Sequence, residues 1–255
     1  MTLHVSTLPF ATDRGLGTRA RLGLVAAASD AVIEHDFREI IGRMTDVELY
    51  TARYDGRNLA PHHDARDALA ALIPTTNLLL PGERLDAVAL ACGTSALTTG
   101  EDAIEGMFRQ SRPGLHVVTP VGAIRAALSR FGIRHLRVLT PYRGAFNTQI
   151  DRALTKGGVT VAILGSFDEE RDAIIGTITP SSIRETVLTL AEIAPIDGFL
   201  IVGSQLRSIR IVGELERELG VPVICSGHAL IWHALRSAGV NDRAPEFGLL
   251  FNLPT

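Results

Sequence analysis

An internal repeat is the feature that most constrains the fold of this chain. The stretches LDAVALAC (85–92) and IDGFLIVG (196–203) share an aspartate six positions before the last residue, and each is followed by a small polar turn and a segment with helical spacing. The next stretches, GLHVVTPVGAIRAALSRFG (114–132) and GVPVICSGHALIWHALRSAG (220–239), are also parallel in pattern. A repeat offset by about 111 residues predicts two similar halves related by a pseudo-twofold axis.

Short apolar runs alternate with longer segments of helical spacing in both halves. The runs that we expect to be strands are RLGLVAA (21–27), VELYTA (47–52), LDAVALA (85–91), GLHVVT (114–119), RHLRVLT (134–140), GVTVAIL (158–164), DGFLIVG (197–203) and GVPVIC (220–225). Strands that alternate with helices indicate a parallel sheet. We therefore expect an α/β fold with two pseudo-symmetric, doubly wound parallel-sheet domains of about four strands each.

The expected first domain contains residues 1–113 plus 220–255, and the second contains residues 114–219. Residues 1–19 have no periodic apolar pattern and are rich in Thr, Gly and Arg, so we expect them to form an arm. Ligands of open parallel sheets bind beyond the carboxyl ends of the strands. The turns after Cys92 and Gly203 are therefore expected to face each other across one cleft between the domains.

The cysteine that ends the first repeated strand is followed by GTSALTT, a turn of small and hydroxyl-bearing residues. Only the thiolate is a good base or nucleophile, and N–H groups at a helix N-terminus lower the pKa of a thiol from about 8.5 towards neutrality. Preorganised donors also stabilise charge that develops on a carboxylate. Cys92 is thus a candidate nucleophile or proton carrier, although a lone cysteine at a strand end is usually a packing residue.

Composition excludes several other classes of protein. A net charge of −3, with 25 basic residues scattered along the chain, gives no nucleic-acid footprint. The longest apolar runs are far shorter than the roughly 20 residues that span a bilayer, so we expect no membrane partner and a cytoplasmic location. Two cysteines 133 positions apart form neither a disulfide framework nor a zinc motif, and we expect no metal site.

The strand that ends in Cys92, its counterpart turn, LTPYRGAFN (139–147) and VPVICSGHALIWHALRSAG (221–239) together resemble the aspartate/glutamate racemase superfamily. The branch with maleate cis-trans isomerase, arylmalonate decarboxylase and the ectoine-utilisation racemase-like proteins is the most similar. The likeness extends from about residue 22 to residue 239. Its most specific parts are TPY (140–142) followed by Asn147, and the segment ALIWHALRSAG (229–239).

The resemblance implies a cofactor-independent isomerase, racemase-like enzyme or carbon–carbon lyase that acts beside a carboxylate of a small acid. It implies that Cys92 is the catalytic thiol and that Thr94 and Ser95 hold the substrate carboxylate. Tyr142 and Asn147 would line the same pocket. The partner is then a small carboxylate substrate, and a homo-oligomer stays possible.

The chain departs from the pattern of this branch at three positions. Gly203, followed by Ser204, stands where the second cysteine is expected, so racemisation by two opposed thiols cannot operate in that form. Asp30 replaces an asparagine that binds a substrate carboxylate, and an ionised carboxylate cannot donate a hydrogen bond. His228 stands where an amide is common, and an imidazole there is a candidate for the missing proton donor.

Simpler interpretations remain beside these. Thr94 and Ser95 are also good helix caps, Asp30 is equally suited to cap a helix that begins near Ala31, and His228 could cap the helix that follows it. Cys225 is expected to be a core residue. The alternative function is an ectoine-degradation-associated or other small-ligand-binding protein that has lost two-cysteine chemistry, and a cysteine hydrolase would require a histidine beside Cys92.

Overall fold

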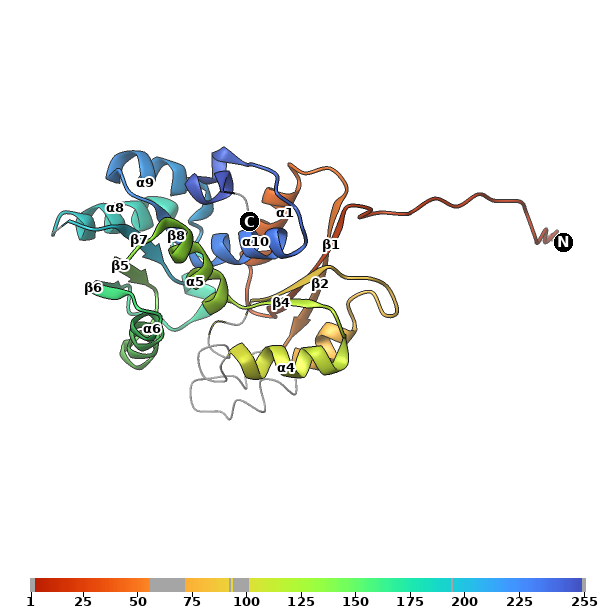
Figure 1. Ribbon diagram of the computed structural model, residues 1–255, viewed down its shortest axis with the longest axis horizontal. Coiled ribbons are helices and arrows are strands. Elements are labelled where there is room, and N and C mark those ends of the chain that lie inside the picture. Colours follow the sequence, from red (N-terminus) through yellow and green to blue (C-terminus); the bar gives the residue numbers. More distant parts are fainter. Residues whose placement is uncertain (1–2, 56–71, 92, 94–100, 194, 254–255) are drawn as a thin grey trace.

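Two sheets of four parallel strands form the centre of the molecule, one for each half of the repeat (Figure 1). The computed structural model describes residues 3–55, 72–91, 93, 101–193 and 195–253. The strand order is β2-β1-β3-β4 in the first sheet and β6-β5-β7-β8 in the second, so the two sheets have the same topology. The predicted α/β fold with two four-stranded parallel sheets is confirmed.

Strands and helices alternate along the chain as the sequence pattern predicts. The strands are β1 (Ala20–Ala27), β2 (Val47–Tyr54), β3 (Ala87–Ala91), β4 (His116–Val118), β5 (His135–Thr140), β6 (Thr160–Ser166), β7 (Gly198–Ile201) and β8 (Val223–Cys225). The helices are α1 (Ile33–Ile41), α4 (Glu101–Ser111), α5 (Pro120–Phe131), α6 (Gly144–Lys156), α7 (Asp172–Ile175), α8 (Pro180–Ala191), α9 (Val212–Leu219) and α10 (Ser226–Ser237), with 3-10 turns η2 (Ile209–Ile211), η3 (Pro245–Phe247) and η4 (Leu249–Asn252).

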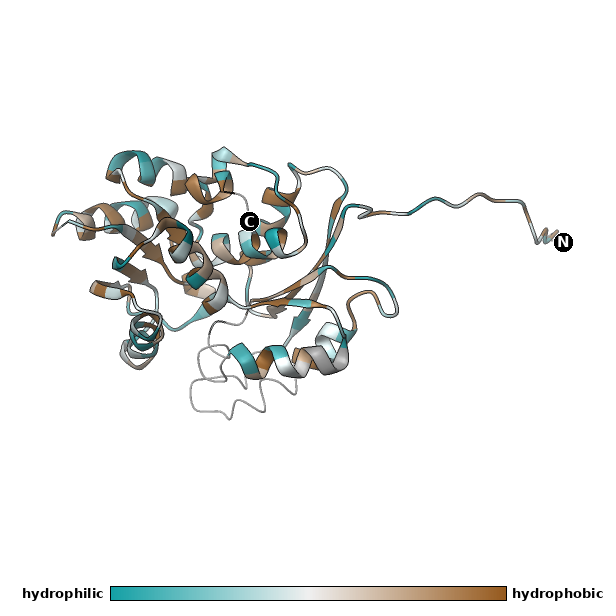
Figure 2. Cartoon of the chain, viewed as in Figure 1, coloured by the Kyte–Doolittle hydropathy of each residue, from teal (hydrophilic) through white to brown (hydrophobic). Residues whose placement is uncertain are grey.

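Burial follows this alternation. Every residue of β3 and β7 is buried, because helices cover both faces of a parallel sheet. The helices mix hydrophobic and hydrophilic residues along their length (Figure 2). Residues 3–16 form no helix or strand, are all exposed, and extend away from the body (Figure 1). No helix in the described part of the chain is long and apolar enough to cross a membrane.

The two halves exchange helices rather than strands. β4 pairs with β3 in the first sheet, and β8 pairs with β7 in the second. The expected domain boundaries at residues 114 and 220 fall just before these two strands, and the division of the chain into domains at these residues stays a prediction. The helices that follow them cross over: α5 packs against β8, and α10 packs against β3 and β4. Apolar runs predict a strand but not its pairing partner, so these pairings become visible only in the structure.

The aspartate shared by the two repeat units has the same structural role in each. Asp86 accepts a hydrogen bond from the backbone N–H of Arg21 at 2.8 Å, where β1 begins. Asp197 accepts one from the backbone N–H of His135 at 3.0 Å, where β5 begins. In both sheets the residue before the third strand thus satisfies a backbone donor of the neighbouring strand. The repeated aspartate in the sequence therefore corresponds to the same hydrogen bond between neighbouring strands in both sheets.

Helix α1 of the first half lies against the second half. The Glu39 carboxylate pairs with Arg210 of η2 at 2.9 Å, and the Ser29 hydroxyl donates to Asp172 of α7 at 2.5 Å. On the same helix Asp36 is 4% exposed. Burial, together with the negative charges of Glu39 and Asp30, raises the pKa of Asp36 to about 8, and Arg210 offsets only part of that. Asp36 is therefore neutral in the folded protein at pH 7.

Neutralising Asp36 permanently is expected to stabilise the protein above pH 7. The ordinary pKa of an aspartate is about 3.9, so a raised folded-state value makes folding increasingly unfavourable as the pH rises from about 4 to about 8. Asp36→Asn removes this contribution, and its free energy of unfolding should exceed that of the wild type at pH 7.5 and fall less steeply between pH 5 and pH 8. Urea unfolding across this range measures both.

Asp151→Asn is the matched control, because Asp151 is exposed on α6. That variant should follow the wild-type pH dependence. Parallel curves for Asp36→Asn and the wild type would show that Asp36 is ionised in the folded state.

Candidate functional site

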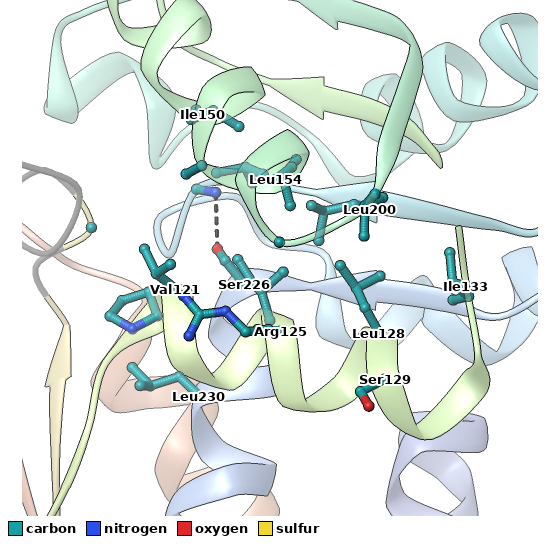
Figure 3. A pocket seen from close by; sticks show the side chains of 18 of the residues that line it. Val121, Arg125, Leu128, Ser129, Ile133, Ile150, Leu154, Leu200, Ser226 and Leu230 are labelled. Atoms are coloured by element: carbon teal, nitrogen blue, oxygen red, sulfur yellow. Dashed lines mark hydrogen bonds between the residues drawn. The ribbon is translucent and has the colours of Figure 1, made fainter. Parts of the chain in front are cut away.

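A cavity of about 390 Å³ begins where the strands of the two repeat units end. Its lining includes Gly93, which comes two residues after β3, and Gly203 and Ser204, which follow β7. Tyr142, from the turn after β5, also lines it. So does Ser226, at the start of α10 (Figure 3). Residues next to both strand ends thus border one cavity, which is the place where an open parallel sheet binds its ligands. We call the part of the cavity lined by these five residues the mouth.

The expected catalytic cysteine and its turn lie outside the described residues. This applies to Cys92, Thr94 and Ser95. On one side of Cys92, Ala91 ends β3 in register with Ala26 of β1. On the other side, Gly93 lines the cavity. The roles assigned to these three residues therefore stay predictions.

Gly203 has a backbone conformation that explains why a glycine stands there. Its φ is +129°, a region that residues with a side chain rarely adopt. A Cβ atom at this position would lie 3.1 Å from Cδ of Pro141 and 3.4 Å from Cγ of Leu206. The N–H of Gly203 donates to Oγ of Ser226 at 2.9 Å (Figure 3). The second turn is thus built around a glycine, and a thiol there would require a different turn.

Asp30 uses both carboxylate oxygens within the protein. Oδ1 accepts the backbone N–H groups of Val32 and Ile33, each at 2.9 Å, and so caps the start of α1. Oδ2 accepts the hydroxyl of Ser204 at 2.7 Å. The helix-capping interpretation of Asp30 therefore agrees with the geometry. The same carboxylate also ties the first half to a residue that lines the mouth.

Tyr142 presents a neutral phenol to the mouth. Burial raises its pKa well above the ordinary value, and the nearby carboxylates of Asp172 and Asp30 raise it further. Its ring contacts Phe146 edge-on, with the centroids 4.7 Å apart. A phenol held in this state can donate a hydrogen bond to an anionic ligand.

Asn147 supports the turn that carries Tyr142 and is not among the described residues that line the cavity. Its Oδ1 accepts the hydroxyl of Thr140 at 2.6 Å, and its Nδ2 donates to the carbonyl of Tyr142 at 2.7 Å. Both ends of the amide are therefore bonded within the turn. The geometry favours a positioning role for Asn147 over direct contact with a ligand.

His228 and Cys225 are core residues in this structure. His228 is fully buried, Nε2 lies 2.6 Å from the carbonyl oxygen of Phe247, and burial lowers its pKa to about 4. It does not line the cavity, so the structure gives no support to its proposed role as a proton donor. Cys225 is 2% exposed, and burial raises its pKa to about 12, so it is an unreactive thiol.

Sequence reasoning missed Ser226. Its oxygen accepts the Gly203 N–H, and none of the described residues accepts its own hydrogen, which leaves that hydrogen for a ligand in the mouth. Its place directly after Cys225, where a strand passes into a helix, was a signal that could have found it. The apolar walls of the cavity, which come from helices α5 and α6, were missed as well, because helical spacing does not show which apolar residues line a cavity.

The mouth offers neutral hydrogen-bond donors rather than metal ligands. Among the described residues no group of three or more His, Cys, Asp or Glu side chains could hold a metal ion. Tyr142 and Ser226 can both donate to a carboxylate, and a buried, preorganised donor is worth more than one in water. The arrangement suits charge that develops on a carboxylate next to a reacting carbon.

Comparison with known proteins gives consistent results. The family model described as arylmalonate decarboxylase matches residues 83–251. Arylmalonate decarboxylase of Bordetella bronchiseptica is 28% identical over 141 residues, which are 54% of this chain and 59% of that protein. Maleate isomerase of Geobacillus stearothermophilus is 19% identical over 244 residues, 91% of this chain and 97% of that protein.

The fold is also similar to a solved structure of Nocardia farcinica maleate cis-trans isomerase bound to TRIS. The TM-score is 0.77 at 19% sequence identity, and the match covers 91% of this chain and 97% of the other. The family model itself covers well over half of the chain. The chain therefore belongs to the arylmalonate decarboxylase family, and it is an enzyme of the isomerase or decarboxylase type.

Proposed function

We propose that this protein is a one-thiol enzyme in which Cys92 acts on the carbon next to a carboxylate of a small acid. The substrate carboxylate lies in the mouth, where it accepts hydrogen bonds from Tyr142 and Ser226. The observation that carries the proposal is that Gly93, the residue after Cys92, lines the same cavity as Gly203 and Ser204 of the opposite turn. A thiol that points from that position into the cavity faces the donors.

One thiol is sufficient for both reactions known among the relatives. In a decarboxylation the bond to one carboxylate breaks, CO₂ leaves, and the electron pair stays on the central carbon as the enediolate of the remaining carboxylate. The Cys92 thiol then transfers its proton to that carbon and regains one from water. In a cis-trans isomerisation the thiolate adds to the double bond, the new single bond rotates, and the same thiolate leaves.

Racemisation by two opposed thiols finds no support in this chain. It needs a second acid on the opposite face of the substrate, and the backbone conformation of Gly203 strains any side chain at that turn. The other cysteine, Cys225, is buried with a raised pKa. Two kinds of reaction are compatible with both observations: one in which the Cys92 sulfur adds to the substrate and later leaves, and one in which the Cys92 thiol donates a single proton.

The apolar lining of the cavity favours decarboxylation over isomerisation of a small diacid. Beyond the mouth, the described walls consist mainly of Leu, Ile, Val and Phe side chains. Maleate has no apolar substituent to place there, whereas a substituted malonate does. Burial of that substituent would supply binding free energy in proportion to its apolar area. We therefore place substituted malonates first among the candidate substrates.

Removal of the Cys92 thiol is expected to abolish turnover, and removal of the Cys225 thiol is not. Cys92→Ala and Cys225→Ala delete the same group from two strand ends, but only the first deletes the proposed acid or nucleophile. Incubation with maleate, aryl-malonates and small N-acyl diamino acids, followed by NMR, should show a loss of at least a hundredfold for Cys92→Ala. Equal turnover by this variant and the wild type would contradict the proposal. Binding of these acids by the wild type without turnover would also contradict the proposal.

Adding a single methyl group at Gly203 is expected to destabilise the protein. A residue with a side chain must be strained at a φ of +129°, and its Cβ would press on Pro141. Gly203→Ala should lower the free energy of unfolding by about 1–3 kcal/mol, as judged by urea unfolding. Gly144→Ala is the control, because a Cβ there meets nothing within 4 Å, and it should change stability by less than about 1 kcal/mol. Equal effects of the two variants would show that the turn tolerates a side chain.

A further inference from the structure

The cavity does not end at the mouth but continues along the second sheet between two helices. We call this part the α5–α6 groove. Its walls and floor are formed by Val121, Ile124 and Leu128 of α5, Ile150 and Leu154 of α6, and Leu200 of β7. Figure 3 shows the side chains of α5 and α6 facing each other across it, with Leu200 between them. The groove and the mouth are therefore one continuous space.

The groove is long compared with a small diacid. Tyr142 lies just after the end of β5 and Ile133 lies just before its start, and both line the cavity. The six residues of β5 rise about 3.3 Å each, so the cavity extends roughly 20 Å along the sheet. Its volume of about 390 Å³ falls in the range of about 300–1,000 Å³ typical of pockets for drug-sized ligands.

Charge and polarity are distributed unevenly along this space. Hydroxyl donors stand at the mouth, and none of the described residues that line the cavity is acidic. Arg125, on the side of the groove, pairs with the Glu101 carboxylate at 2.7 Å, and the same carboxylate accepts the Thr119 hydroxyl at 2.5 Å. The charge of Arg125 is thus already balanced by Glu101. Arg134 also lines the cavity, beside Ile133 at the end away from the mouth. Between that end and the hydroxyl donors of the mouth, the lining is mainly apolar.

We propose that the substrate carries an extended apolar substituent, alkyl or arylalkyl, that lies in the α5–α6 groove while its carboxylate is held at the mouth. This inference rests on the proposed function for the position of the carboxylate. The groove and the mouth are continuous, so a chain attached to the reacting carbon enters the groove directly. This is why we assign the groove to a substituent of the substrate. The enzyme would then select substituted acids by chain length. Short diacids such as maleate would leave the groove unfilled.

Binding measurements separate this inference from the catalytic one. The Cys92→Ser variant does not consume its ligand in the proposed mechanism, so dissociation constants of 2-alkylmalonates from methyl to octyl can be measured on it by isothermal titration calorimetry. Each methylene that enters the groove should lower Kd by about fourfold. Kd that stays constant from methyl to octyl would overturn the inference. Chain-length-dependent binding without turnover by the wild type would overturn the catalytic proposal and leave the groove in place.

A bulky residue in the groove should remove this dependence on chain length. Ala153 of α6 is half-buried and lines the cavity, so Ala153→Trp fills the groove without touching the mouth. In the Cys92→Ser background it should raise Kd for octylmalonate at least tenfold and change Kd for methylmalonate less than twofold. Arg152→Trp is the control, because Arg152 is exposed on the same helix and is not a lining residue. It should preserve the full chain-length dependence.

A second variant guards against a folding defect in Ala153→Trp. Leu154→Gln keeps nearly the same size but places an amide in the apolar wall, so it should weaken octylmalonate binding at least fivefold, and its melting temperature is measured alongside to show that the variant is folded. Size-exclusion chromatography with light scattering on each variant tests the competing occupant, a second copy of this chain. A dimer that dissociates in Leu154→Gln, together with no dependence of Kd on chain length, would assign the groove to an interface and contradict the proposal.

Discussion

The Asp30 carboxylate connects the elements on which the candidate site depends. One oxygen caps α1 through the N–H groups of Val32 and Ile33, and the other accepts the Ser204 hydroxyl from the opposite half. The helix that packs against the second half is therefore anchored at the residue that also fixes one side of the mouth. An asparagine could cap the helix as well, but its amide would donate to the Ser204 oxygen and reverse the direction of that hydrogen bond. The charge of Asp30 is thus used in assembling the site, and it need not face the ligand.

The fold could be predicted from the sequence because the two sheets are built in the same way and therefore carry the same pattern of residues. Asp86 and Asp197, which made the repeat visible, each satisfy a backbone donor at the start of a neighbouring strand. The strand partners of β4 and β8 could not be predicted in this way, because pairing depends on which face each following helix covers. Gly203 was identified as a missing cysteine, but its φ of +129° becomes evident only in three dimensions. The burial of His228 could not be predicted from its position in the repeat, because it depends on Phe247 in the 3-10 turn η3, which comes after α10.

The chemistry of the site and its shape support each other. The second turn is built on a glycine, and the proposed mechanism uses one thiol and develops negative charge on one substrate carboxylate. Neutral donors at the mouth, Tyr142 and Ser226, suit that charge. The helix exchange that brings α5 under the second sheet also forms one wall of the groove, so the same topological feature that joins the halves gives the site its apolar extension.

The proposed function requires Cys92 to be a reactive thiol, and the buried Cys225 serves as an internal comparison. Alkylation of the native protein with iodoacetamide between pH 5 and pH 10, with each cysteine followed by peptide mass spectrometry, distinguishes the two thiols. We expect an apparent pKa for Cys92 well below 8.5, protection of Cys92 by a bound malonate, and no reaction at Cys225, whose pKa is raised to about 12 by burial. A Cys92 that titrates at 8.5 or above and is not protected by the ligand would show that it is not the proposed catalytic thiol.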